Sequence, residues 1–302
     1  MSLQLVFDAL SLGAIYATAA LGVALIFGVM KLVNFAQGQF LAFCVFALIV
    51  PSKDAVAVMG LGAAPAYVLI PVILLIGISL AVLSELVVFR HLRDAEPVVL
   101  MVASFSLGVV IQNLLLMVYG GRPKAVSLWP ELGQPVEILG ASVPALQIIV
   151  ICTIVLMLIA LSLGLKFTRI GLEMRAAAEN FGMARLLGVR ANRVIMMAFA
   201  VSGFLAAMLA LIFVAQTGVA DVNMGASIVL IAFVATVLGG MGSLPGAVLA
   251  GLLLGAVSTI LQAYLPIELR PFRDAFLYGL VIVVLLVRPQ GLFTLSSTSN
   301  RI

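Results

Sequence analysis

The sequence predicts an all-α protein, a polytopic transmembrane helical bundle of about 8–9 membrane segments. Hydrophobic residues make up 64% of its 302 residues and charged residues only 9%, whereas about a quarter of an ordinary soluble domain is charged. Apolar runs of about 20 residues, long enough to cross the hydrocarbon core of a membrane, recur along the chain. We therefore expect residues 1–302 to form a single transmembrane domain without a soluble domain.

Hydropathy places the candidate membrane spans in order along the chain. They cover residues 5–29, 35–50, 66–89, 97–119, 144–165, 194–215, 225–240, 245–264 and 274–288. The first span is expected to be a membrane helix and not a signal peptide, because no basic n-region or cleavage site accompanies it. The spans 35–50 and 225–240 are short, so the exact number of crossings stays open.

Basic residues are unevenly divided between the two sides of the predicted membrane domain. The connections at 30–34, 90–96, 166–193 and from 288 onward hold 11 Lys and Arg residues, and those on the other side hold 5. Because cytoplasmic loops are enriched in Lys and Arg, the richer side is expected to be cytoplasmic. The C-terminus is then inside, and the N-terminus is outside if all nine spans cross.

Residues 171–193 (GLEMRAAAENFGMARLLGVRANR) are polar and helix-prone, although long apolar runs flank them on both sides. Apolar residues alternate here with charged residues at helical spacing, which is typical of a helix that docks into a groove of a soluble partner. An interfacial helix that only anchors two spans would show the same pattern. Gly182 and Gly188 are expected to break the helix, since glycine costs about 1 kcal/mol in a helix interior.

Both short spans lie beside a break in the apolar pattern, NFAQGQ at 34–39 and GGMGSLPG at 239–246. In membrane transporters, short or glycine-interrupted segments point to a site near the membrane midplane. Alternatively, NFAQGQ is only a helix-breaking interfacial loop and the glycine stretch serves only helix packing. The amides of a third span could face the same path or bond to a neighbouring helix. The candidate residues of a substrate path are Asn34, Gln37, Gly38, Gln39, Gln112, Asn113, Gly239, Gly240, Gly242 and Ser243.

Small residues recur at every fourth position from Gly239 through Ser243, Ala247 and Gly251 to Gly255. On one helix they would form a seam that lets a neighbouring backbone approach closely. Alternatively, residues 239–243 unwind and expose backbone groups to a transport path, because irregular backbone is tolerated at membrane depth where it lines a cavity.

The sequence lacks the residues that nucleotide binding, catalysis or metal binding by this chain would need. The sequence has no phosphate-binding Walker motif, and its one histidine, His91, lies among arginines in a predicted loop. Ser243 has no histidine to activate it, and Cys44 and Cys152 are not spaced as metal ligands. We therefore expect no catalytic residue, no metal site and no cofactor in this chain. Glu85, near the end of its span, is expected to have a structural role, either pairing locally with a basic residue or reaching the membrane interface.

The stretch RAAAENFGMARLLGVRANRVI at 175–195 resembles the cytoplasmic coupling segment of ABC importer permeases, with a degenerate Ala-Ala-Glu and a later glycine. NFAQGQF at 34–40, VLGGMGSLPGAVLAG at 237–251 and RPQGLF at 288–293 are similar to the permeases of branched-chain amino acid ABC importers and of their urea- and amide-importing relatives. Many members of that family carry His and Glu where this chain has Gln37 and Gln39, so the resemblance does not fix a leucine-type substrate.

The resemblance implies a permease subunit, not an enzyme, in the bacterial cytoplasmic (inner) membrane, surrounded by lipid and moving branched-chain or other hydrophobic amino acids. It implies two cytoplasmic ATPases that bind the ATP, a second permease in a heterodimer and an extracytoplasmic solute-binding protein, but no nucleic acid. Residues 166–193 would form the coupling segment. Its contacts would come from Arg175, Ala177, Ala178, Glu179, Arg185, Leu186, Leu187 and Gly188. Urea, short amides and aromatic or other hydrophobic acids remain alternative substrates, and a stand-alone secondary transporter or facilitator is the alternative class.

Overall fold

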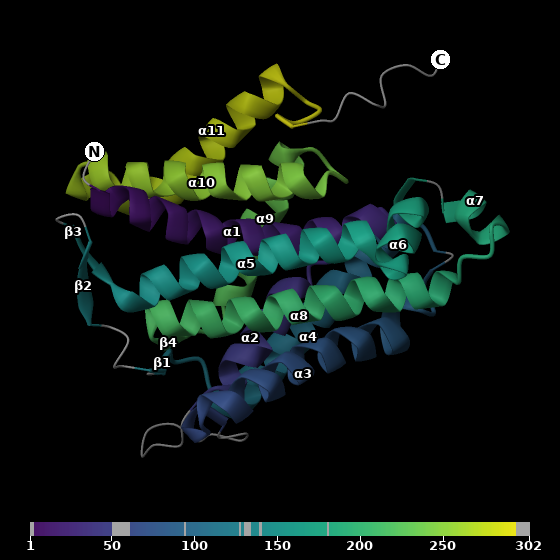
Figure 1. The fold of residues 1–302 in the computed structure, drawn as a ribbon, viewed down its shortest axis with the longest axis horizontal. Coiled ribbons are helices and arrows are strands. Elements are labelled where there is room, and N and C mark those ends of the chain that lie inside the picture. Colours follow the sequence, from purple (N-terminus) through teal and green to yellow (C-terminus); the bar gives the residue numbers. More distant parts are fainter. Residues whose placement is uncertain are drawn as a thin grey trace.

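The protein is a bundle of helices that run between two ends, as the computed structural model shows (Figure 1). The described residues are 3–49, 61–93, 95–126, 128–129, 134–138, 141–179 and 181–293. One end, the hairpin end, holds the short strands and the N-terminus. The other, the α6 end, holds the two short helices α6 and α7.

Six helices of the described residues are long and apolar enough to cross a membrane. They are α1 (Leu3–Met30), α3 (Ala66–Ser84), α4 (Pro97–Tyr119), α5 (Ala145–Phe167), α8 (Ala191–Thr217) and α10 (Leu244–Tyr264). A π-helical turn at Glu85–Phe89 extends α3. In α1 the most apolar stretch is 89% buried, compared with 22% in α3 and α5, so α1 is the central helix of the bundle.

Three shorter helices complete the bundle: α2 (Gln37–Ala47), α9 (Met224–Gly239) and α11 (Arg273–Val287). At 1.5 Å per residue, α2 is about 16 Å long and α9 about 24 Å, which is less than the thickness of the hydrocarbon core. Each of the nine predicted spans overlaps one of these nine helices, with bounds that differ by at most three residues when the π-helical turn is counted with α3. The predicted class, an all-α membrane bundle, is therefore confirmed, including its two short segments.

The strands are short and lie at the hairpin end (Figure 1). There β1 (Lys124–Ala125) pairs antiparallel with β4 (Val219–Ala220), and β2 (Pro135–Ile138) pairs antiparallel with β3 (Ala141–Pro144). In register, Lys124 lies opposite Ala220 and Pro135 opposite Pro144. Two 3₁₀ turns, Leu61–Ala63 and Ile267–Phe272, precede α3 and α11.

The predicted seam of small residues is divided between two helices. Gly239 is the last residue of α9 and Ser243 caps the N-terminus of α10, because Gly240 and Gly242 turn the chain with φ angles of 96° and 95°. Only the part of the seam from Ala247 onward therefore lies on one helix. There Gly251 and Gly255 pack so closely on the backbone of α1 that an added Cβ would clash with it, as expected for small residues at a membrane helix interface.

The polar segment 171–193 is not one helix. It contains most of α6 (Arg169–Glu179), then α7 (Phe181–Leu186) and the start of α8. Gly188 breaks the helical path as predicted, with a φ of 87°. The prediction for Gly182 is wrong, because this residue lies inside α7. A single glycine lowers helix stability by only about 1 kcal/mol, which neighbouring residues can offset.

Candidate functional site

Helices α6 and α7 project from the α6 end of the bundle (Figure 1). The side of α6 that faces the bundle consists of the buried residues Gly171, Met174 and Ala177, three positions apart. Ala178 is half-buried and Glu179 is exposed. The spacing of three matches one face of a helix, so α6 rests on the bundle and its opposite face is open.

Two large apolar side chains at the end of α7 are almost fully exposed. Leu186 is 83% exposed and Leu187 is 80% exposed, and Gly188 follows them with its left-handed backbone. Such a pair on a charged, projecting segment is the kind of exposed apolar surface that marks an interaction site. The side chain of Arg185, which we predicted to contact a partner, lies outside the described part of the chain.

Arg175 turns back toward the bundle. Its Nη2 donates a hydrogen bond of 3.0 Å to the backbone oxygen of Lys166, at the C-terminal end of α5. A basic side chain in this position satisfies one of the carbonyl groups that a helix leaves open at its last turn. Arg175 therefore joins α6 to α5.

A buried carboxylate links α3 to the start of α8. Glu85 is fully buried and pairs with Arg90 at 3.3 Å and with Arg93. Arg93 also donates to the side chain of Asn192, the second residue of α8. The predicted local pairing of Glu85 is confirmed, and the cluster fixes the helix that follows the projecting segment.

The predicted path residues of the NFAQGQ stretch lie inside the bundle where α2 begins. Nε2 of Gln37 donates to the backbone oxygen of Ser202 in α8 at 2.9 Å, and the Ser202 hydroxyl donates to Oε1 of Gln37 at 2.5 Å. Oδ1 of Asn34 accepts from the backbone N–H of Ala36 at 3.1 Å. Nδ2 of Asn34 and Oε1 of Gln39 are buried without a hydrogen-bond partner among the described residues.

The beginnings of α2 and α9 meet at two glycines. A Cβ added to Gly38 would clash with the backbone oxygen of Gly225, and one added to Gly225 would clash with that of Gly38. From this contact α2 runs toward the hairpin end, and α9 runs toward the α6 end (Figure 1). Gly225 and Ser202 could not be recognised from the sequence, because no local pattern distinguishes them from other small residues in apolar runs.

A second polar contact joins α4 to the start of α9. Nε2 of Gln112 donates to Oδ1 of Asn223 at 3.0 Å, while Nδ2 of the exposed Asn113 donates to the backbone oxygen of Val109 in its own helix at 2.8 Å. Asn223 and Ser227 are exposed on the same helix end. The sequence left open whether Gln112 faces a substrate path or bonds to a neighbouring helix, and the structure shows the bond to the start of α9.

The four path residues of the glycine-rich turn lie at the α6 end. Ser243 accepts a hydrogen bond from the N–H of Gly246 at 3.2 Å and so caps α10. The backbone N–H of Leu292 donates to the oxygen of Leu238 at 2.7 Å, and Gly291 packs against Gly240. The turn at 239–243 and the stretch RPQGLF thus pack together, apart from the interior contact between Gly38 and Gly225.

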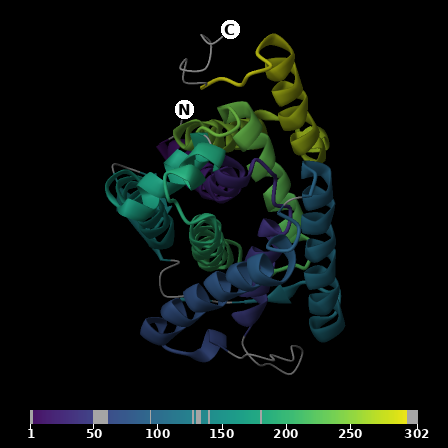
Figure 2. The same cartoon turned by 90° about the vertical axis from the view of Figure 1, so that its right-hand side faces the viewer.

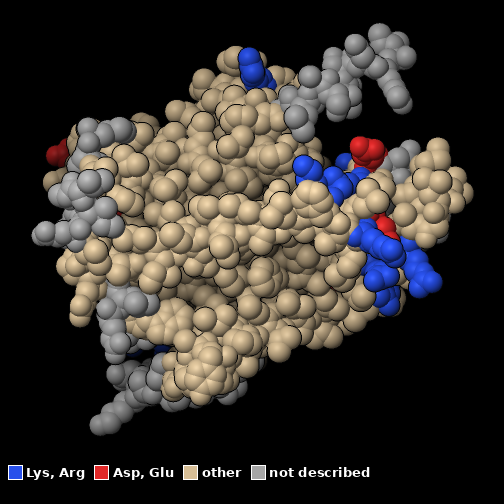
Figure 3. Space-filling view, in the orientation of Figure 1, with Lys and Arg blue, Asp and Glu red and all other residues tan. Residues whose placement is uncertain are grey.

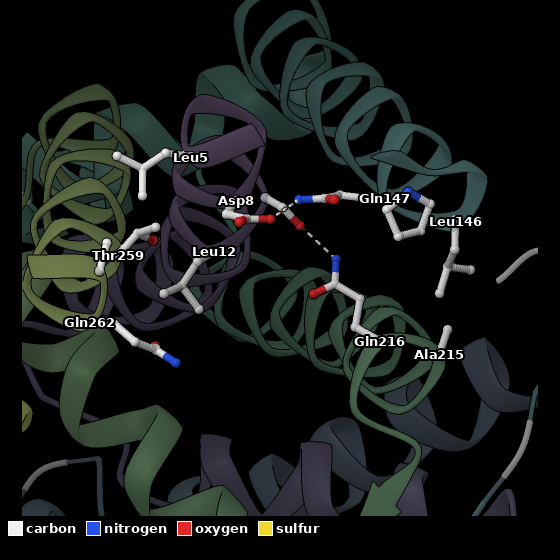
Figure 4. Close-up of a pocket in the computed structure, with 12 residues that line it drawn as sticks. Leu5, Asp8, Leu12, Leu146, Gln147, Ala215, Gln216, Thr259 and Gln262 are labelled. Atoms are coloured by element: carbon white, nitrogen blue, oxygen red, sulfur yellow. Dashed lines mark hydrogen bonds between the residues drawn. The ribbon is translucent and has the colours of Figure 1, made fainter. Parts of the chain in front are cut away.

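A cavity of about 640 Å³ opens at the hairpin end between α1, α5, α8 and α10 (Figure 4). Asp8 accepts a hydrogen bond of 2.9 Å from Gln147, and Ser11 accepts one of 2.7 Å from Gln216. This cavity was not predicted from the sequence, although an acidic residue in an apolar run, such as Asp8, is itself a signal of a functional position. Among the described residues there is no cluster of His, Cys, Asp and Glu that could hold a metal ion.

Apolar spanning helices, polar contacts between them and a helix pair that projects from one end together define a multi-pass membrane protein of the permease class. The family model described as "Branched-chain amino acid transport system / permease component" matches residues 5–285. The chain belongs to this family, which comprises transport permease components and not enzymes.

The individual relatives agree with the family. The chain is 30% identical to the high-affinity branched-chain amino acid transport system permease protein LivH of Escherichia coli (strain K12), over 96% of this chain and 94% of LivH. It is also 30% identical to the permease protein BraD of Pseudomonas aeruginosa, over 96% of this chain and 95% of BraD. A probable LivH permease of Methanocaldococcus jannaschii is 24% identical, over 90% and 86% of the two chains. No solved structure matches the chain.

Proposed function

We propose that the chain is the permease subunit of an ABC importer for branched-chain or other hydrophobic amino acids in the bacterial cytoplasmic membrane. Two separate cytoplasmic ATPases would bind and hydrolyse the ATP, and an extracytoplasmic binding protein would deliver the solute. The relatives named LivH and BraD support the substrate class, because their names describe branched-chain amino acid transport.

The observation that carries the proposal is the projection of α6 and α7 (Figure 1), with Leu186 and Leu187 exposed at the end of α7. Two leucines that are largely exposed on their own chain suit a groove on a soluble partner. Glu179 and Arg185 would make polar contacts beside them, and Ala177 and Ala178 would hold α6 on the bundle. Closure of the ATPases would then move α5 and α8, the helices on either side of the segment.

The charge distribution supports a cytoplasmic location for the α6 end. Basic side chains gather at this end of the molecule (Figure 3), and the connections predicted to lie there hold 11 Lys and Arg residues. If all nine apolar helices cross the membrane, the N-terminus lies outside and the C-terminus inside. This orientation places the projecting segment in the compartment where ATP is available.

Exposed polar side chains on α4 and α9 support a pairing surface for a second permease. Asn113, Asn223 and Ser227 are exposed, and Gln112, seven residues before the end of α4, lies about 10 Å from that end. At such depth polar groups face protein or a water-filled cavity and not lipid. We assign the substrate path of a heterodimer to the face formed by α4 and the start of α9, and the contact between α2 and α9 lies behind this face. Figure 2 shows α4 along one side of the bundle.

The uncharged amides of the path fit a zwitterionic solute. Gln37, Gln39 and Gln112 can donate and accept hydrogen bonds without burying a net charge. These groups would suit an amino acid at the path, and they would also suit urea or a short amide. A ligand screen of the binding protein that copurifies with the chain would distinguish these substrates.

The proposal is tested by purifying the tagged chain from native membranes with ATP and vanadate, which trap assembled ABC complexes, followed by mass spectrometry. We expect ATPases, a second permease and a binding protein to copurify. The double substitution Leu186→Asp and Leu187→Asp should remove the ATPases alone. The control is Met241→Asp, which changes a residue that is 55% exposed at the same end and should leave the complex intact.

Uptake provides the second readout. Substitution of Glu179 or Gly188 should abolish uptake while the chain remains inserted in the membrane. Normal uptake by both variants would contradict the proposed coupling. Transport by the chain alone in nucleotide-free liposomes would instead establish a stand-alone facilitator.

A further inference from the structure

A groove follows the surface between α5 and α10, near the α6 end. Its volume is about 500 Å³, which lies in the range of about 300–1,000 Å³ that is typical of ligand pockets. Leu21 of the central helix α1, which is only 4% exposed, forms its floor. Its walls are Leu158, Leu161 and Leu165 of α5 and Leu244, Val248 and Leu249 of α10.

Two cationic side chains, Lys166 and Arg175, line this groove together with the apolar residues. Lys166 comes from the last turn of α5 and Arg175 from α6, and both are exposed. The hydrogen bond of 3.0 Å from Arg175 to the backbone oxygen of Lys166 holds the guanidinium at this point. A guanidinium has five N–H donors, so several can still bind an anion. Among the described residues that line the groove, none is acidic.

The position along the helix matches the layers of a membrane. α5 is a candidate membrane span that ends at Phe167, so Lys166 lies at the level of the lipid headgroups and the leucines lie at the level of the acyl chains. The outward side of α5 is apolar, with Leu156 71% exposed, Ile159 54% and Leu163 50%. The groove therefore continues into a surface that suits lipid.

We propose that the groove between α5 and α10 binds an anionic phospholipid, with one acyl chain along the leucines and the phosphate between Lys166 and Arg175. Charge complementarity favours this occupant, because a basic pocket between membrane helices at the cytoplasmic surface suits an anionic headgroup. Arg175 belongs to α6, so the bound lipid also ties the projecting segment to the membrane. This role rests on the proposed cytoplasmic location of the α6 end, but it does not depend on the transported substrate.

Native mass spectrometry of the purified full-length chain tests the site directly. The chain is titrated in detergent with phosphatidylglycerol or with zwitterionic phosphatidylcholine, and the bound lipids are counted. We expect phosphatidylglycerol to bind about 25-fold more tightly, since each of two cations near an anionic lipid contributes roughly a fivefold gain in affinity. The double substitution Lys166→Gln and Arg175→Gln should remove this preference.

Two matched controls separate a built site from general surface charge. The double substitution Arg190→Gln and Arg193→Gln removes the same charge from exposed residues near the same end and should keep the preference. Val248→Trp, which fills the groove without changing charge, should lower phosphatidylglycerol binding, whereas Leu156→Trp on the outward side of α5 should not.

Three results would overturn the proposal. The first is equal affinity of the native chain for phosphatidylglycerol and phosphatidylcholine. The second is a loss of the preference for phosphatidylglycerol that is as large in the Arg190→Gln and Arg193→Gln variant as in the Lys166→Gln and Arg175→Gln variant. The third concerns the assembled transporter: a Leu161→Cys variant that cross-links to another polypeptide would show that protein covers the groove.

Discussion

Gln37 and Ser202 hydrogen-bond to each other in both directions inside the bundle. The Gln37 amide donates to the Ser202 backbone oxygen at 2.9 Å, and the Ser202 hydroxyl donates to the Gln37 side-chain oxygen at 2.5 Å. The hydroxyl also lies 3.2 Å from the backbone oxygen of Gly22. A contact between residues 165 positions apart thus joins α2, α8 and α1 where the chain enters its first short helix.

Ser202→Ala should destabilise the bundle by about 1 kcal/mol, because hydrogen bonds between membrane helices average about 0.6 kcal/mol and reach about 1.7. The free energy of unfolding in mixed detergent and SDS micelles would measure the loss. Ser79→Ala is the control, since this residue is exposed and its hydroxyl donates within α3, to the oxygen of Ile76. Equal losses in the two variants would show that the Gln37 contact adds nothing.

Gly38→Ala should force α2 and α9 apart, because the added Cβ meets the backbone oxygen of Gly225. Overpacking of this kind costs typically about 1–3 kcal/mol, and we expect lower thermal stability in detergent. Gly28→Ala is the control, because it shows whether a methyl group added at another glycine also lowers thermal stability. Apart from its own helix backbone and chain neighbours, nothing in the described part of the chain lies within 4 Å of a Cβ at Gly28, so this variant should be as stable as the native chain or more stable. Equal destabilisation would contradict the close contact.

Arg93→Ala should cost much more stability than Arg90→Ala, although both arginines pair with Glu85. The side chain of Arg93 is 16% exposed and that of Arg90 is 38% exposed. Removing one partner of a buried pair costs about 3–5 kcal/mol, whereas exposed pairs contribute about 0–1 kcal/mol. Equilibrium unfolding would compare the two. In a Glu85→Gln background the cost of Arg93→Ala should fall, and an unchanged cost would exclude the ion pair as its cause.

Gly188→Ala should disturb the projecting segment more than Gly182→Ala. The φ of 87° at Gly188 is unfavourable for residues with a Cβ, by about 1–2 kcal/mol, whereas Gly182 lies within α7, where alanine favours the helix. Copurified ATPase per permease would measure the effect. Gly188→Asn should retain more ATPase than Gly188→Ala, because asparagine tolerates the left-handed region better. The reverse order would point to a cause other than backbone strain.

The membrane spans and the projecting segment could be predicted from sequence because both depend on local composition. A run such as 194–215 is apolar enough to cross a membrane whatever its neighbours are, and the charges of 171–193 exclude that segment from the hydrocarbon core. The division of the segment into α6 and α7 was less predictable, because the cost of one glycine is small beside the packing of neighbouring residues.

The contacts of the site were decided only by the tertiary structure. Gln37 could be recognised as a polar residue in an apolar run, but not Ser202 as its partner or Gly225 as the neighbour of Gly38. Lipid is as apolar as the interior of the bundle, so membrane helices need no polar outer face to mark which side is buried. The sequence by itself therefore determined which segments enter the membrane and which segment leaves it, while long-range helix packing decided which faces meet and where a groove remains.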